Sequence, residues 1–512
     1  MSRRISSRLP GRKDKAMKLS RALKNSGIEH SGPDPEITLI TNDSRQAAAG
    51  ALFFALPGAK TDGNLFLLQA LERGAAAVVC GGKIPAGLRA AFPGSALLKA
   101  EDPQRALSAI AANFHGHPSR KMKIYGITGT KGKTTTAYLL ESILRAEGEK
   151  PGVIGTIDYR VDGRVIAPAA NTTPLAHRLQ ELLRCMTEAG AASAVMEVSS
   201  HALALGRVED VEFDYAAFTN LQRDHLDFHK DRESYFSAKA RIFDLLAASG
   251  KKDRCAVINA DDERAPALLE KIGSKVRVLT FGIDKAADFR ASAVEISDTG
   301  TSFTLAAGGE ELPVRLDLLG RHNIYNALTA ITLAAAGGIS PRSAVAGAEA
   351  LANVPGRLER VRLGQNFTVF VDYAHTDAAL ENVLSNLRLM PHAKIITVFG
   401  CGGDRDRTKR APMGQISCAL SDKAIVTSDN PRTEDPTRIF SDIEEGIKGR
   451  FRNYEIIPDR RAAINRAVAL AGEGDIVLIA GKGHETYQIL KDSTIHFSDT
   501  EAAAEAIRAK TA

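Results

Sequence analysis

Residues 123–136 read KIYGITGTKGKTTT. The apolar start, with Ile124 and Tyr125, predicts a buried strand, the glycines predict a turn, and the threonines lead into a helical pattern. A strand, a glycine-rich turn and a helix N-terminus together form the context in which backbone N–H groups bind phosphate. The usual pattern requires glycine at the position of Ile127, so the spacing is altered. Two interpretations stay open: a nucleotide site with unusual spacing, or a tight turn with a solvated lysine.

Strands alternate with helices on both sides of this stretch, from residue 119 to about 338. Such alternation predicts an α/β fold with a mostly parallel sheet that is covered on both faces. The expected strands are 152–157, 194–199, 216–221 and 255–260, and the expected helices are 134–148, 177–190, 234–248 and 322–338.

Two further blocks flank this central one. The first mixes short strands (37–44 and 51–58) with an expected helix over 66–80, and a helix with an exit linker over 93–121. After residues 355–357 the alternation restarts, with expected strands at 368–374, 394–400, 423–428 and 475–481. We therefore predict three domains, residues 1–118, 119–353 and 354–512, which agrees with 512 residues at roughly 150 per domain.

Composition limits the classes of protein that remain. No apolar run approaches the roughly 20 residues that span a bilayer, so no membrane span is expected. The five cysteines are scattered, which favours a reducing cytoplasm over a disulfide framework or zinc site. A net charge of +6 from interleaved charges suits acidic small molecules better than nucleic acid. The basic residues 1–17 lack the apolar core of a secretory signal and are expected to form an arm, unless Met17 is the start.

Several polar clusters follow predicted strands, where ligand sites of α/β proteins collect. Glu197 in MEVSSH could hold Mg²⁺ or cap a helix, and DHLDFH (224–229) could be a metal or phosphate site or a polar loop. Lys239, in a predicted helix, is either a solvated charge or a buried amine of lowered pKa. GCGGDRDRTKR (400–410) offers Arg405, Arg407, Lys409 and Arg410 as anion-binding donors, unless it is a solvated basic loop. SDNPRTEDP (428–436) and AGKGHETYQ (480–488) add glycines and ionic side chains, with a turn interpretation still open for the first of them.

Taken together and in order, these motifs resemble the Mur ligase family. The resemblance rests on GTKGKTT, NTTP, EVSSH, DHLDFH, SYFSAKARIF, GRLE, DYAH, GCGGDRD, DNPR and GKGHE, which span about residues 40 to 500. It implies a UDP-binding N-terminal domain, a central P-loop-type ATP-binding domain and a Rossmann-like C-terminal domain that binds an amino acid. It also implies that the altered loop spacing is expected, because the family's loop has the GTxGKT form.

The resemblance implies an ATP-dependent amide ligase of peptidoglycan precursor synthesis, acting in the bacterial cytoplasm as a monomer with Mg²⁺. ATP would phosphorylate the D-Glu side-chain carboxylate of UDP-MurNAc-L-Ala-D-Glu, and an amino group would attack the acyl phosphate. By resemblance, the catalytic residues are Lys133, Glu197, His225 and Lys239. The magnesium ligands would be Thr134, Glu197, His225 and Lys239 as a carbamate (N6-carboxylysine).

The remaining roles are also implied by resemblance. ATP would contact Gly129, Thr130, Lys131, Gly132, Lys133, Thr134, Thr135, Asn323, Asn326, Arg357 and Asp372. The UDP-MurNAc-dipeptide would contact Ser44, Arg45, Thr172, Thr173, Ser199 and Arg207. The incoming amino acid would contact Arg405, Asp429, Asn430, Arg432, Gly481 and Glu485.

Arg432 in DNPR favours meso-diaminopimelate as that amino acid. Its distal carboxylate can accept two hydrogen bonds from one guanidinium, whereas L-lysine would leave the arginine unpartnered. A lysine-adding relative, a folylpolyglutamate-synthetase-like ligase, a silent ATP-binding scaffold and a nucleic-acid-binding module remain as alternatives. Two positions depart from the family pattern: His322 stands where phenylalanine is common, and Asp377 where proline is common.

Overall fold

The computed structural model describes residues 16–58, 61–222, 224, 226–297 and 299–511. These residues pack as two compact units. The first holds the described residues up to Ser292 with Leu305–Leu312 and Tyr325–Ala350, and the second holds the described residues of Ala293–Thr304 with Pro313–Ile324 and those from Leu351 onward. Within the described ranges, no helix has the length and apolar character needed to cross a bilayer.

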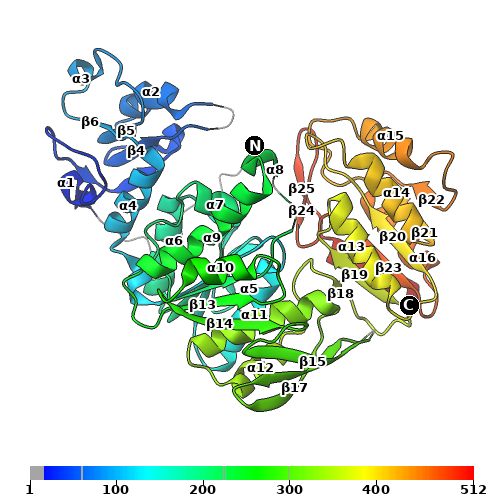
Figure 1. The fold of residues 1–512 in the computed structure, drawn as a ribbon. Helices are drawn as coiled ribbons and strands as arrows, with labels where there is room; N and C mark the ends of the chain where they lie inside the picture. Colours follow the sequence, from blue (N-terminus) through cyan, green and yellow to red (C-terminus); the bar gives the residue numbers. More distant parts are fainter. Residues whose placement is uncertain (1–15, 59–60, 223, 225, 298, 512) are drawn as a thin grey trace. The chain divides into compact units, whose positions relative to one another are not determined.

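A large twisted sheet forms the centre of the first unit (Figure 1). Six neighbouring strands form its parallel core in the order β8-β11-β7-β12-β13-β14, and β15 continues the parallel pairing beyond β14. They are β7 Lys123–Thr128, β8 Pro151–Ile154, β11 Ser193–Glu197, β12 Tyr215–Phe218, β13 Cys255–Asn259 and β14 Arg277–Gly282. The predicted parallel sheet is confirmed.

Helices cover both faces of this sheet. One face packs against α6 Ala176–Glu188, α9 Arg232–Ala248 and α10 Ala265–Ile272 in a single apolar cluster. On the other face, α5 Lys133–Ala146 contacts β7, β8 and β11 and packs on α12 Pro341–Glu349. Leu140, Ile143 and Leu144 of α5 are all buried, as the helical periodicity predicted.

The sheet is wider than the sequence indicated. At one edge lie β9 Asp158–Val161 and β10 Arg164–Pro168, and at the other β15 Phe289–Ile296, β16 Thr301–Ala307 and β17 Glu310–Leu316. Burial alternates along β16 between buried and partly buried residues. The apolar runs that marked the central strands are therefore absent from these edge strands.

The N-terminal part of the first unit has its own parallel sheet, ordered β3-β4-β5-β6. The strands are Leu39–Thr41, Ala51–Ala55, Ala77–Cys80 and Ala96–Lys99, and the helices are α1 Leu19–Ala22, α2 Leu67–Glu72, α3 Leu88–Ala91 and α4 Pro103–His115. The helix predicted over 66–80 is wrong in its second half. Helix α2 ends at Glu72, Gly74 turns the chain at φ +94°, and the apolar stretch 77–80 is a buried strand.

The second unit contains a six-stranded sheet ordered β18-β19-β23-β20-β21-β22. Its strands are Glu359–Arg360, Thr368–Asp372, Ile476–Ala480, Ile395–Phe399, Lys423–Val426 and Tyr454–Ile456 in that order. Helices α13 Asp377–Arg388, α14 Arg410–Leu420 and α15 Pro436–Ile447 cover one face, and α16 Arg460–Leu470 and α17 Asp499–Thr511 cover the other. The predicted second α/β domain is confirmed.

Candidate active site

The stretch 123–136 forms a strand, a turn and a helix, as predicted. Strand β7 ends at Thr128, and α5 begins at Lys133 with Gly132 as its N-cap. The first backbone N–H groups of a helix have no acceptor within it, and the helix dipole makes this end positive. The turn therefore presents an anion-binding helix end at the carboxyl edge of the sheet.

The altered glycine spacing has a structural explanation. Gly126 lies inside β7, where an added Cβ would come within 2.7 Å of the Phe213 ring and 2.9 Å of the Ile242 side chain in helix α9. Gly129 makes the turn at φ +148°, and a Cβ there would come within 1.9 Å of Thr219 Oγ1. One glycine therefore serves helix–sheet packing and the other serves the loop.

We expect Gly129→Ala to abolish nucleotide binding. The methyl group meets both an unfavourable φ and the Thr219 hydroxyl, so the loop must shift. Gly148→Ala is the matched control, because Gly148 also has positive φ (+78°) but nothing lies within 4 Å of its added Cβ. Calorimetric titration with ADP should show binding lost only in the first variant. Equal binding by both would contradict this role of the turn.

Glu197 ends β11 and is 1% exposed. Its carboxylate accepts hydrogen bonds from the Thr134 hydroxyl (2.9 Å), the Thr156 hydroxyl (2.9 Å) and the Thr156 N–H (2.9 Å). No cationic side chain among the described residues forms an ion pair with it. A buried carboxylate with only neutral donors beside a phosphate-type loop fits a site that receives a cation.

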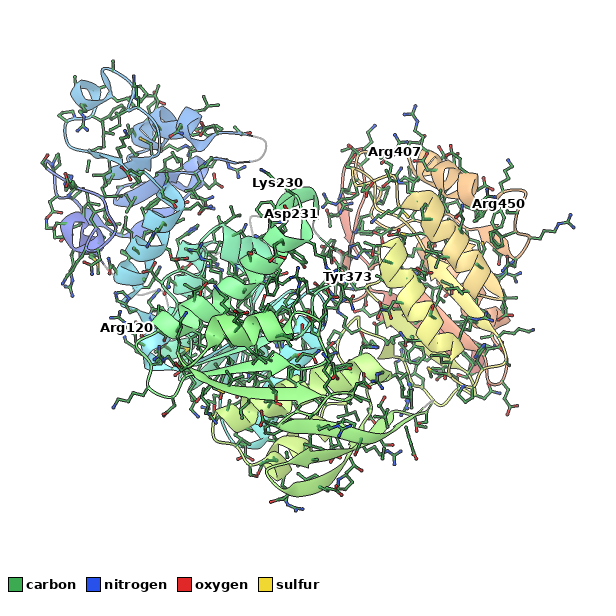
Figure 2. All side chains as sticks on the ribbon, viewed as in Figure 1. Arg120, Lys230, Asp231, Tyr373, Arg407 and Arg450 are labelled. Atoms are coloured by element: carbon green, nitrogen blue, oxygen red, sulfur yellow. The ribbon has the colours of Figure 1, made fainter. Side chains whose placement is uncertain are left out.

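Lys239 lies in the middle of α9, which Asp231, labelled in Figure 2, caps by accepting from the Ser234 N–H. The side chain is 1% exposed, so the interpretation as a solvated lysine is wrong. Its Nζ donates to Gly129 O at 2.7 Å and lies 4.4 Å from the centre of the Tyr235 ring. Burial, and then the charge of Lys133, hold the pKa of Lys239 well below its usual value.

Lys133 converges on the same carbonyl oxygen. Its Nζ donates to Gly129 O at 2.8 Å and to Thr130 O at 3.0 Å. Two amino groups, one buried and one half-buried, therefore share one acceptor, and two positive charges at this distance would repel each other. This repulsion adds to burial, the larger cause, in lowering the pKa of Lys239, and a lowered pKa favours the neutral amine.

The cluster 224–229 is described in part. His225, a predicted metal ligand, lies outside the described residues. Asp224 forms an ion pair with Lys131 of the loop at 3.1 Å. His229 is buried, and its Nε2 lies 2.9 Å from the Ser200 hydroxyl.

The predicted dipeptide-binding residues of the central domain lie side by side. The Thr173 hydroxyl donates to Glu197 O (2.8 Å) and accepts the Ser199 N–H (3.0 Å), while Ser199 also caps helix α7 (Ser200–Ala204). Arg207 Nη1 donates to Thr173 O at 2.9 Å, and its buried Nε has no partner among the described residues. Thr172 Oγ1 is 3.1 Å from Thr156 Oγ1. An arginine nitrogen buried without an acceptor suits an anionic ligand group.

Ser44 and Arg45 lie in a short 3-10 helix of the N-terminal sheet, Ser44–Gln46. The Ser44 hydroxyl donates to Gln69 Oε1 at 2.6 Å. Arg45 is exposed and paired with Asp43, which holds the pKa of Asp43 below its usual value. Both side chains therefore have partners within the N-terminal part of the first unit.

In the second unit, the predicted amino-acid site forms a tight network at the ends of β21 and β23. Asn430 Nδ2 donates to Glu485 (2.8 Å), and Asn430 Oδ1 accepts from Ile489 N–H (2.9 Å). A Cβ added to Gly481 would lie 2.8 Å from Asp429 Oδ2, so only glycine permits this approach.

Arg432 adopts a left-handed conformation (φ 54°) and is half-buried. Its Nη1 donates to Gly403 O (2.9 Å) and Asn430 O (3.3 Å), which leaves Nε and Nη2 without a partner among the described residues. Arg405 of the neighbouring loop is exposed. Arg410, which we grouped with the anion-binding donors, is fully buried and paired with Glu434 and Asp442. We interpret it as a structural residue, because these carboxylates and Gly402 O occupy both terminal nitrogens, while its Nε has no partner among the described residues.

The predicted ATP-contacting residues outside the phosphate loop divide between the units. Asn326, in the first unit, lies against the loop, since a Cβ on Gly132 would come within 2.3 Å of its Oδ1. In the second unit, Asn323 donates to Leu319 O at 2.8 Å, and buried Asp372 accepts the Leu358 and Ala374 N–H groups. Arg357 stacks 5.2 Å from the ring of Tyr373, labelled in Figure 2. Burial raises the pKa of Asp372.

The two residues that depart from the family pattern, His322 and Asp377, both lie in the first turn of a helix. His322 lies in the first turn of α11 (Arg321–Ala336) and is exposed. Asp377 is the first residue of α13, where a negative charge favours the helix N-terminus.

Sequence reasoning missed two residues of these clusters. Thr156 joins Glu197 to Thr172, and its position at the carboxyl end of the predicted strand 152–157 could have marked it. Lys482 is fully buried, with Nζ 2.9 Å from Glu485 and 3.2 Å from Asn430 Oδ1. It stood within the GKGHE motif, but only its neighbours Gly481 and Glu485 were selected.

The fold and these clusters define a multidomain α/β protein with a phosphate-binding loop. Three family models match in order: "Mur ligase family, catalytic domain" over residues 36–115, "Mur ligase middle domain" over 127–334, and "Mur ligase, glutamate ligase domain" over 356–483. The chain belongs to the Mur ligase family, which confirms the family and the three-domain fold inferred from the motifs.

Individual relatives cover nearly the whole chain. A UDP-N-acetylmuramoyl-L-alanyl-D-glutamate–2,6-diaminopimelate ligase from Solibacter usitatus is 46% identical over 473 residues, 92% of this chain and 94% of the relative. The enzyme of the same name from Syntrophomonas wolfei is 43% identical and covers 96% of this chain and all of the relative (100%). A solved structure of a ligase with this name is 31% identical, has a TM-score of 0.68, and covers 97% of this chain and 100% of its own.

Proposed function

We propose that this protein is an ATP-dependent amide ligase that adds meso-diaminopimelate to the D-Glu side-chain carboxylate of UDP-MurNAc-L-Ala-D-Glu. Relatives that cover at least nine-tenths of the chain and bear the name of this ligase support the proposal. The observation that carries it is the convergence of Lys133 and buried Lys239 on Gly129 O beside Glu197. Such a cluster can bind phosphates and metal together.

Carbamylation of Lys239 would remove the conflict between the two lysines. The neutral amine attacks CO₂, a C–N bond forms, one proton leaves, and the product is an anionic carbamate. The carbamate keeps one N–H, which can still donate to Gly129 O. Its negative charge would attract Lys133, whereas an ammonium at the same place repels it.

The residues present fit magnesium. The Glu197 carboxylate, the Thr134 hydroxyl and the Lys239 carbamate are all hard oxygen donors, with His225 as a further proposed ligand. When bound, magnesium neutralises phosphate charge during transfer. Lys133 and the backbone of residues 129–135 would bind the ATP phosphates.

The substrates would be held by the remaining clusters. Thr172, Thr173, Ser199 and Arg207 would orient the dipeptide, and the partnerless Arg207 Nε suits a carboxylate. Ser44 and Arg45 would contact the uridine nucleotide, and Asn323, Asn326, Arg357 and Asp372 the nucleoside of ATP. The amino acid would be held by Arg405, Asp429, Asn430, Arg432, Gly481 and Glu485.

In this reaction a D-Glu carboxylate oxygen attacks the γ-phosphorus, and ADP leaves. The amine of diaminopimelate then attacks the acyl carbon, the amide bond forms, and phosphate leaves with one former carboxylate oxygen. We assign the roles to residues 1–118 (UDP-MurNAc), 119–353 (ATP) and 354–512 (amino acid), in a cytoplasmic monomer.

An isotope experiment tests this proposal. Substrate labelled with ¹⁸O in the D-Glu side-chain carboxylate is turned over with ATP and diaminopimelate. Mass spectrometry should find one ¹⁸O in each phosphate released and one in the amide product. Phosphate without label, formed together with amide product, would exclude the acyl phosphate.

A further inference from the structure

Arg460 and Asp499 form a completely buried ion pair on one face of the second sheet. They are the first residues of α16 and α17. Arg460 Nε and Nη2 donate to the two Asp499 carboxylate oxygens, each at 2.7 Å, and both side chains are 0% exposed. This parallel arrangement fixes the plane of the guanidinium.

The remaining donor capacity of Arg460 is directed at two strand ends. Nη1 donates to Ser428 O at 3.3 Å, and Nη2 donates to Ala480 O at 3.0 Å. Ser428 directly precedes Asp429, and Ala480 directly precedes Gly481. The guanidinium thus contacts the chain one residue before two positions of the proposed amino-acid site.

The sheet alone does not connect these strand ends. Strand β20 lies between β21 and β23 in the sheet, so no backbone ladder joins the segments that carry Asp429 and Gly481. Their separation is nevertheless tightly set, since a Cβ on Gly481 would lie 2.8 Å from Asp429 Oδ2 and 4.0 Å from Arg460 Nη2. Arg460 provides a direct hydrogen-bonded link across β20.

We propose that Arg460, held in place by Asp499, is a positioning residue that sets the spacing of Asp429 and Gly481 for the incoming diaminopimelate. This inference rests on the proposed function. Stability alone does not account for the pair well, because a buried ion pair contributes little compared with apolar packing of the same volume. What an arginine supplies here is planar, multidentate geometry that lysine cannot reproduce.

The test is Arg460→Lys, which keeps the positive charge next to Asp499 but removes the planar guanidinium and its parallel hydrogen bonds. The KM for diaminopimelate should rise roughly 10- to 100-fold, as expected for a small misplacement of a binding group. The KM for UDP-MurNAc-L-Ala-D-Glu should change by less than about 3-fold, because all of its proposed contacts lie in the first unit. Asp499→Glu keeps the charge and shifts the carboxylate. If the lysine variant does not fold, this variant should show the same selective rise in the KM for diaminopimelate.

Arg160→Lys is the matched control. Arg160 is also buried and paired with two carboxylates, Glu141 and Asp158, but lies in the first unit. This variant reports the general effect of weakening a buried arginine pair. It should leave the diaminopimelate KM unchanged relative to the KM for UDP-MurNAc-L-Ala-D-Glu. The inference about Arg460 would be overturned if Arg460→Lys raised the KM for diaminopimelate and the KM of the reference substrate equally. It would also be overturned if the KM for diaminopimelate rose no more than in Arg160→Lys. In either case the proposed function would stand. Absence of diaminopimelate turnover by the unaltered protein would overturn the proposed function, and this inference with it.

Discussion

Lys239→Ala protein is expected to lose about 10²- to 10³-fold in kcat, the range found when one preorganised electrostatic group is removed from an active site. The lysine is buried against Gly129 O and beside Lys133, where its carbamate would supply the negative charge that holds magnesium. Alanine cannot form a carbamate. Steady-state phosphate release, with the fold checked by circular dichroism, measures the effect.

Lys251→Ala is the control for this variant. Lys251 Nζ also donates to a backbone carbonyl, Met122 O at 2.8 Å, and pairs with Asp214 at 3.0 Å, at the amino end of the sheet. Its loss should leave kcat within about 3-fold, as for sites distant from the chemistry. Small carboxylates such as formate should partly restore Lys239→Ala, because they fit the vacated space. Full activity of Lys239→Arg, which cannot be carbamylated, would contradict the carbamate.

Arg432→Ala should lower kcat/KM for diaminopimelate by about 10²-fold, the equivalent of two charge-assisted hydrogen bonds. Nε and Nη2 lack partners among the described residues, so they can receive the distal carboxylate. L-lysine has no such group, and its much weaker turnover should change little. The ratio of the two kcat/KM values, measured by amide product formation, reports the selection.

The control for Arg432 is Arg407→Ala. Arg407, labelled in Figure 2, belongs to the adjacent basic loop but is exposed and paired with Asp442 at 3.1 Å. Removing it should not change the ratio of diaminopimelate to lysine turnover, because exposed ion pairs contribute little. If Arg432→Ala and Arg407→Ala lost selectivity equally, the cause would be the overall positive charge around these loops. The specific hydrogen bonds of the Arg432 guanidinium would then not be the selector.

The strands that organise both units could be predicted because they are buried on both faces. β7, β13, β20 and β23 read as continuous apolar runs in the sequence, and polar or glycine residues follow each one. The clusters at their carboxyl ends followed from the same topology. The position of the phosphate loop could be predicted from the sequence. The role of Gly126 could not be predicted, because its neighbour Phe213 is distant in sequence.

The features that could not be predicted depend on contacts between distant residues. The sequence around Lys239 does not distinguish it from an exposed lysine on a helix. Its buried amino group contacts Gly129, which is 110 residues away in sequence. Arg460 and Asp499 resemble ordinary charged helix starts until both strand ends are placed. Arg410 looked like an anion-binding residue because its partners, Glu434 and Asp442, lie beyond the motif.

Phosphate release with ATP, Mg²⁺ and UDP-MurNAc-L-Ala-D-Glu, compared between meso-diaminopimelate and L-lysine, tests the central claim most directly. We predict strong turnover with diaminopimelate and at most about one hundredth of it with L-lysine. Turnover with lysine instead would keep the ligase and remove Arg432 as its selector. No turnover with either amino acid by folded protein would contradict the proposed activity.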